Sequence, residues 1–153
     1  MIDPSLNKTQ RSIVNLPAFF GRYEDIIHRS LSTALKITPS DQLDTIIRYH
    51  LGRVDTKGNP VKSSKGKALR PVMCLLACQS LGGLIEHALP AATALELIHN
   101  FSLIHDDIQD GDKERHGRPT VWWVWGRNKG LVSGNAMRIL ADITLWGMIN
   151  KGV

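Results

Sequence analysis

An acidic cluster occupies the middle of the chain, where HDDIQDGD spans positions 105–112. Asp106 and Asp110 are four residues apart, so on a helix their carboxylates share a face, with Asp107 beside it. Converging carboxylates suit Mg²⁺, which uses few protein ligands and completes its coordination shell with water and substrate phosphates. Acids at the C-terminal end of a helix also oppose the helix dipole, and a bound cation would relieve that cost. The alternative is a solvated acidic helix end.

The same helix carries a histidine at matching spacing. His99, Leu103, Asp106 and Asp110 are separated by 4, 3 and 4 residues, which places them near one helical face. We therefore expect His99 and the carboxylates to line one cavity at different depths. A hydrogen-bonded core histidine is the alternative.

A basic cluster, GKALRP, lies at positions 66–71. Lys67 and Arg70 are three residues apart at a predicted helix start, where free backbone N–H groups and the dipole attract anions. The pair suits a phosphate or diphosphate, with Lys as a point charge and Arg as a planar fork; the alternative is a solvated basic patch. Arg115 and Arg118 follow the acidic cluster. Carboxylates between cations, in an apolar helical protein, indicate a diphosphate ester with an apolar tail.

These residues must be positioned by helices, because the apolar periodicity is helical nearly throughout. Ser40 is a good N-cap for the second helix. The predicted helices cover 18–37, 41–51, 68–81, 91–110, 120–126 and 134–150. Residues 1–16 are predicted to form an irregular arm, and 52–66 and 111–119 polar loops, with no clear strand pattern. The four tryptophans are expected to pack in the core.

Composition limits the class of protein. With 153 residues, 42% of them hydrophobic and 22% charged, the chain has the size of one domain or half of a larger one. No apolar run approaches the length of a membrane helix, and no signal-peptide stretch is present, so we expect a cytoplasmic protein without a transmembrane segment. The net charge of +5 would allow a nucleic-acid partner, but the dense acidic cluster argues against one.

Three stretches together resemble the trans-polyprenyl diphosphate synthases, the family of farnesyl and geranylgeranyl diphosphate synthases. They are GKALRP at 66–71, ELIHNFSLIHDDIQD at 96–110 and RHGRPT at 115–120. The resemblance implies an all-α fold, an antiparallel helical bundle of the isoprenoid synthase type. It also implies that residues 17–153 form the N-terminal half of such a domain.

The resemblance assigns roles in a Mg²⁺-dependent condensation of isopentenyl diphosphate with an allylic diphosphate. The first aspartate-rich motif, which holds Mg²⁺ on the allylic diphosphate, matches Asp106, Asp107 and Asp110. The first arginine of the motif R-R-G-x-P, which contacts that diphosphate, matches Arg115. Together these four residues are the implied catalytic group.

Other positions match the isopentenyl diphosphate site and the determinants of product length. The residues implied to bind isopentenyl diphosphate are Lys67, Arg70 and His99. His116 stands where the family usually has a second arginine for this substrate, and Arg118 is the nearest cation that could compensate. Phe101, five residues before Asp106, and its neighbour Ser102 fall where the family sets product length; core packing is the alternative for Phe101.

The family also has a second aspartate-rich motif, which this sequence lacks: its only acid after Glu114 is Asp142. We therefore expect a truncated bundle that is incomplete by itself and is paired as a homodimer or with a complementing chain. A non-catalytic or split subunit is the main alternative. A remote one is a helical HD-type metal phosphohydrolase, built on the pair His105–Asp106.

Overall fold

The computed structural model describes residues 16–61 and 68–149, with the backbone alone for 16–20 and 149. Its helices are α1 (Leu16–Ala34), the 3₁₀ helix η1 (Leu35–Ile37), α2 (Asp41–His50), α3 (Leu69–Ser80), α4 (Ile85–Asp110), α5 (Val121–Trp125) and α6 (Arg127–Ile149). Ser40 caps α2 as predicted, its Oγ accepting from the backbone N–H of Leu43 at 3.2 Å. The predicted N-terminal arm lies outside the described residues, except for Leu16.

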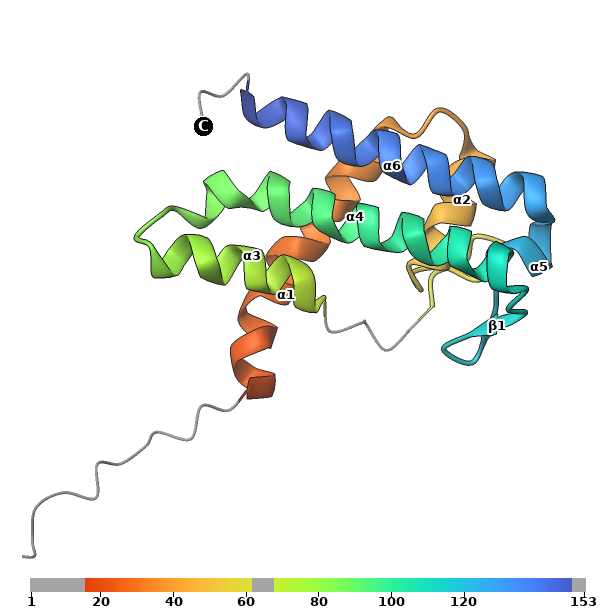
Figure 1. The fold of residues 1–153 in the computed structure, drawn as a ribbon, viewed down its shortest axis with the longest axis horizontal. Coiled ribbons are helices and arrows are strands. Elements are labelled where there is room, and N and C mark those ends of the chain that lie inside the picture. Colours follow the sequence, from red (N-terminus) through yellow and green to blue (C-terminus); the bar gives the residue numbers. More distant parts are fainter. Residues whose placement is uncertain (1–15, 62–67, 150–153) are drawn as a thin grey trace, which may run out of the picture.

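The helices form an antiparallel bundle around α4. Helix α4 lies between α3 and α6, and both neighbours run opposite to it, while α1 crosses behind them (Figure 1). The predicted all-α fold class is confirmed. Buried apolar side chains from every layer meet in one core: Tyr23, Ile27, Leu31, Ile47, Leu75, Leu97, Ile104 and Met137. Their burial removes apolar surface from water and holds the helices together.

Two helices begin earlier in the chain than the sequence pattern predicts. Helix α4 starts at Ile85 rather than at 91, with Pro90 inside it. Proline removes one helical hydrogen bond, but here it lies in the second turn of a helix packed against its neighbours. Helix α6 starts at Arg127 rather than at 134. Gly130 and Gly134 lower the helical signal of that segment, yet their lack of side chains lets α6 approach α4 closely.

The segment 111–119, predicted to be a loop, contains a β-hairpin. Strands β1 (Glu114–Arg115) and β2 (Arg118–Pro119) pair antiparallel, with Arg115 opposite Arg118. The turn residues His116 and Gly117 have φ values of +53° and +73°. Two central residues with positive φ match a type I′ turn, whose twist suits a two-residue hairpin. The turn thus brings Arg115 and Arg118 side by side.

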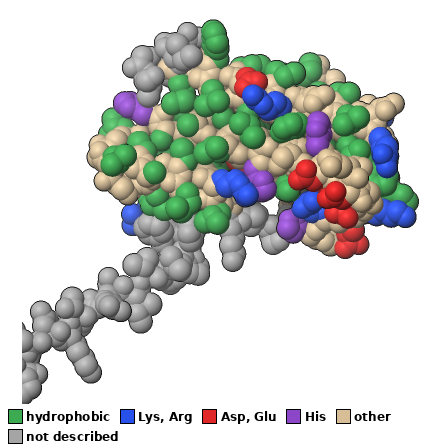
Figure 2. All heavy atoms as spheres, viewed as in Figure 1, with side chains coloured by type: hydrophobic (Ala, Val, Ile, Leu, Met, Phe, Trp, Pro, Cys, Tyr) green, Lys and Arg blue, Asp and Glu red, His purple; other side chains and the backbone are tan. Residues whose placement is uncertain are grey.

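A row of apolar side chains on α6 faces outward. It comprises Val132, Ile139, Ile143 and Trp146, which follow each other at spacings of 7, 4 and 3 residues and are 48–67% exposed. Hydrophobic side chains are spread over the face that α3, α4 and α6 form (Figure 2). The expectation that all four tryptophans are core residues is therefore wrong. Trp122 and Trp125 pack against the core, whereas Trp123 and Trp146 are exposed.

Candidate functional site

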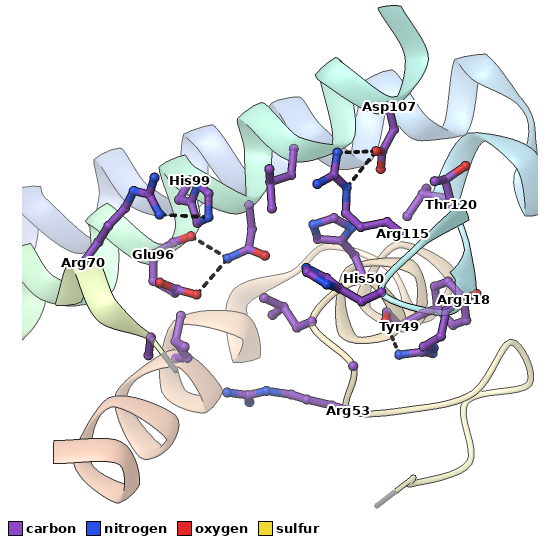
Figure 3. Close-up of a pocket in the computed structure, with 18 of the residues that line it drawn as sticks. Tyr49, His50, Arg53, Arg70, Glu96, His99, Asp107, Arg115, Arg118 and Thr120 are labelled. Atoms are coloured by element: carbon purple, nitrogen blue, oxygen red, sulfur yellow. Dashed lines mark hydrogen bonds and ion pairs between the residues drawn. The ribbon is translucent and has the colours of Figure 1, made fainter. Parts of the chain in front are cut away.

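A cavity of about 650 Å³ lies between the end of α2, the start of α3, one face of α4 and the β1–β2 hairpin. Its charged lining is Arg53, Arg70, Arg115, Arg118, Glu96 and Asp107 (Figure 3). Asp107 is paired with Arg115, and Glu96 Oε1 accepts a hydrogen bond from Asn100 Nδ2 at 3.0 Å. The cations outnumber the acids, so the cavity suits an anionic ligand.

Arg70 and His99 meet at one end of the cavity, as the sequence predicts. Arg70 Nη1 lies 3.1 Å from His99 Nε2. Burial, and then the Arg70 charge, lower the pKa of His99. A neutral His99 accepts a hydrogen bond from the guanidinium, which keeps further N–H groups free for a phosphate. Lys67, the other predicted member of this group, lies outside the described residues.

Arg115 and Asp107 form the second charged contact of the cavity. Arg115 Nε and Nη2 each lie 2.7 Å from Asp107 Oδ1. Asp107 is 1% exposed, and its Oδ2 is buried with no hydrogen-bond partner. Burial raises the pKa of Asp107, and the contact with Arg115 opposes this rise.

The three predicted metal ligands do not lie together. Asp106 and Asp110 are exposed and stand outside the cavity, whereas Asp107 lies in its wall. The lining arc of α4 runs through Glu96, Asn100, Leu103 and Asp107. The expectation that His99 and all the carboxylates line one cavity is thus wrong for Asp106 and Asp110, because successive helical residues point 100° apart. Asp106 still lies near enough to His99 to favour its charged form.

The donor chemistry of α4 nevertheless fits a hard cation. Among the described residues, no three His, Cys, Asp or Glu side chains converge on a metal-binding point. Two exposed carboxylates one helical turn apart match Mg²⁺, which is usually held by one or two carboxylates together with substrate phosphates. Asp106 and Asp110 are therefore the fitting pair, and Asp107 carries an additional buried oxygen.

The remaining hairpin residues have different roles from those expected. Arg118 donates to the backbone oxygens of Tyr49 and Val54, at 3.1 and 2.8 Å, and its guanidinium lies 4.1 Å from the centre of the Tyr49 ring. It anchors the hairpin and has little freedom to replace the missing arginine. His116 is exposed at the turn and lines the cavity mouth.

Phe101 and Ser102 lie outside the residues that line this cavity. Phe101 is half-buried against the core, with its ring 4.6 Å from that of His105. Ser102 Oγ donates to the backbone oxygen of His99 at 2.8 Å. Nothing in the structure tests their predicted effect on product length.

His105 has no place in a metal site of the HD type. Its ring contacts Phe101, and its Nε2 lies 3.4 Å from the backbone oxygen of Leu131 on α6. A Cβ built on Gly134 would come within 2.5 Å of this ring, so His105 fills the space that the glycine leaves. The ring is packed against α6, which disfavours the phosphohydrolase alternative.

Three polar residues of the cavity were missed by the sequence analysis. Arg53 Nη1 donates to Ser32 Oγ at 2.7 Å, and Asn100, 8% exposed, binds Glu96. His50 ends α2 inside the cavity. The only sequence signal for His50 was a polar residue on an otherwise apolar helical face, two residues after a buried pair of isoleucines.

The fold is that of solved polyprenyl synthetase structures. A polyprenyl synthetase from Streptomyces coelicolor A3(2) superposes with a TM-score of 0.81 at 36% identity, over 88% of this chain and 39% of that one. A geranylgeranyl pyrophosphate synthetase from Geoglobus acetivorans superposes with a TM-score of 0.72 at 30% identity, over 83% of this chain and 38% of that one. The chain is therefore an all-α protein of the isoprenoid synthase class.

The family follows from sequence comparison. The polyprenyl synthetase family model matches residues 56–150, and this chain belongs to that family. A (2E,6E)-farnesyl diphosphate synthase of Mycobacterium tuberculosis is 44% identical over 118 residues, which are 71% of this chain and 33% of that protein. A geranylgeranyl diphosphate synthase of the same species is 36% identical over 128 residues, 84% of this chain and 35% of that protein. The chain thus spans about a third of the length of these relatives. Within its described residues, no helix is long and apolar enough to cross a membrane.

Proposed function

We propose that this chain contributes the first metal site and the isopentenyl diphosphate site of a Mg²⁺-dependent prenyltransferase. The observation that carries the proposal is the cationic cavity, with Arg70–His99 at one end, Arg115–Asp107 at the other and Asp106 and Asp110 outside it. A diphosphate in the cavity and a second diphosphate near the exposed acids would lie on neighbouring parts of α4.

Each predicted residue receives a role in this scheme. Lys67, Arg70, His99 and His116 bind the diphosphate of isopentenyl diphosphate, and Arg115 contacts the allylic diphosphate while it orients Asp107. The residues that would hold Mg²⁺ are Asp106, Asp107 and Asp110. When bound, Mg²⁺ supplies positive charge that stabilises the departing diphosphate.

The chemistry follows from these charges. The cations stabilise the diphosphate as the allylic C–O bond breaks, which leaves an allylic carbocation. The double bond of isopentenyl diphosphate attacks this carbon, and a new C–C bond forms. Loss of a proton to the released diphosphate restores a double bond in a product five carbons longer. Helices that exclude water protect the cation from hydrolysis.

The proposed reaction requires more structure than this chain provides. Residues 17–153 correspond to one part of a synthase domain, since the relatives are about three times as long. We propose that the exposed apolar row on α6 packs against further helices, in a complementing chain or a second copy. Phe101 and Ser102, outside the diphosphate cavity, would then face the prenyl tail and limit its length.

Turnover by the purified chain tests this scheme. The chain is incubated with Mg²⁺, isopentenyl diphosphate and geranyl diphosphate, alone and with candidate complementing chains, and prenyl products are measured. We expect weak or no product from the chain alone and product on complementation. Robust turnover by the isolated chain would refute the incomplete site. Absence of diphosphate binding under all conditions would refute the proposed function.

A further inference from the structure

His50 is a buried titratable residue of the cavity to which the scheme above gives no role. It is the last residue of α2, and it reaches the cavity between α4 and the hairpin (Figure 3). Its Nε2 is buried and has no hydrogen-bond partner. A buried polar atom without a partner is costly, so a ligand that supplies one would bind there with advantage.

The groups around His50 determine what such a ligand must be. Burial, and then the charge of Arg115, lower the pKa of His50 to about 4, with smaller contributions from His99 and Arg118, while a hydrogen bond from the Asn100 side chain opposes the shift. At neutral pH the imidazole is therefore uncharged. Its neighbours on α4 and on both hairpin strands are cationic or polar, and the two cavity acids are already paired.

An anion in the cavity would reverse this electrostatic balance. It would neutralise the field of Arg115 and Arg118 and favour the charged imidazolium, since a nearby opposite charge raises the pKa of a histidine. The other ionisable groups that line the cavity are His28 on α1, Arg53 after α2, Arg70 on α3, Glu96 and Asp107 on α4, and His116 in the turn. His50 lies between the Arg70–His99 pair and Arg115, as Figure 3 shows.

We propose that His50 is a further diphosphate-binding residue, whose Nε2 takes up a proton from solvent and donates it in a hydrogen bond to a phosphate oxygen of the cavity ligand. The inference rests on the proposed function, because it assigns a binding residue to the same diphosphate site. It gives the cavity a cation that forms only when the anion arrives. His50 would thereby offset the presence of His116 where the family usually has an arginine.

Calorimetry with inorganic pyrophosphate tests the proposal on the full 153-residue chain. The variant His50→Phe keeps an aromatic ring without a donor, and it should bind pyrophosphate about tenfold more weakly than the native chain at pH 6, as expected for the loss of a hydrogen bond to a charged group. Its proton uptake, compared in buffers of different ionisation enthalpy, should be lower by about one proton per pyrophosphate. The native affinity should fall as the pH rises through the ligand-bound pKa of His50, and the difference between the two proteins should shrink with it.

Two controls separate this role from general damage. His87→Gln changes an exposed histidine outside the cavity and should leave both affinity and proton uptake at native values. In the native chain, the ring ¹⁵N signals of His50 should show that saturating pyrophosphate raises its pKa above about 4. This measurement does not depend on the folding of a variant.

The outcomes distinguish this inference from the function on which it depends. If native pyrophosphate binding is tight but His50→Phe binds equally well, or if the His50 signals ignore pyrophosphate, the inference is overturned and the diphosphate site stands. If the native chain does not bind pyrophosphate at all, the proposed diphosphate site is overturned together with the inference.

Discussion

Arg115 reaches from strand β1 to helix α4, where its Nε and Nη2 each lie 2.7 Å from Oδ1 of Asp107. This contact ties the hairpin to the end of the longest helix and forms one wall of the cavity. Asp107 is 1% exposed, and burial raises its pKa. The carboxylate therefore depends on Arg115 to remain charged in the folded protein.

Removal of this arginine should destabilise the fold in a pH-dependent way. Because the folded-state pKa of Asp107 is raised from 3.8, stability decreases as the pH rises through the interval between these values. Arg115→Met should raise that pKa further and lower the free energy of unfolding by about 2 kcal/mol at pH 7, with a smaller loss at pH 4, where the carboxyl is largely protonated. Urea unfolding at both pH values measures this.

A double variant provides the control for this ion pair. Asp107→Asn combined with Arg115→Met removes both charges and should recover most of the loss at pH 7. An equal loss at both pH values, with no recovery in the double variant, would contradict the assignment.

The exposed acids at the end of α4 should affect stability with opposite sign in the presence and absence of Mg²⁺. Asp106→Asn with Asp110→Asn removes two negative charges from a helix C-terminus. In EDTA this should stabilise the chain by about 1 kcal/mol in total. Mg²⁺ with pyrophosphate should raise the melting temperature of the native chain, since ligands that bind only the folded state stabilise it, and this shift should be lost in the variant. An unchanged shift would exclude these two residues as the metal ligands.

Two glycines of α6 should respond oppositely to alanine. A Cβ on Gly134 would lie 2.5 Å from two atoms of the His105 ring, so Gly134→Ala should lower the free energy of unfolding by about 1–3 kcal/mol. Gly147 has no heavy atom within 4 Å of an added Cβ. Gly147→Ala should therefore stabilise the helix by about 0.5–1 kcal/mol. Thermal or urea unfolding of both variants measures the difference, and equal effects would contradict the close packing of α4 and α6.

Arg118 should prove structural. Arg118→Lys cannot reproduce two hydrogen bonds to Tyr49 O and Val54 O together with stacking on the Tyr49 ring. We expect the free energy of unfolding to fall by about 1–2 kcal/mol, with little change in pyrophosphate affinity. Arg29→Lys, at an exposed position on α1, is the matched control and should be neutral. A loss of pyrophosphate affinity without a loss of stability would instead make Arg118 a ligand.

The helical elements were largely predictable because each carries its own apolar periodicity. In α1, Tyr23, Ile27 and Leu31 are buried at the predicted helical spacing. The early starts of α4 and α6 were not predictable, since Pro90, Gly130 and Gly134 weaken the local signal and packing between helices overrides it. The hairpin was missed because its two-residue strands are too short to show alternation, and its turn depends on positive φ at His116 and Gly117.

The sequence by itself determined which chemical groups are present and which helix carries them: the acids and His99 on α4, and Arg70 at the start of α3. Only the tertiary structure decided how they divide. It turns Asp107 inward to Arg115, leaves Asp106 and Asp110 exposed, uses Arg118 as an anchor and places His50 among cations. The physical reason is that helical spacing sets relative direction along one element, whereas burial and ion pairing depend on segments far apart in the chain that pack together.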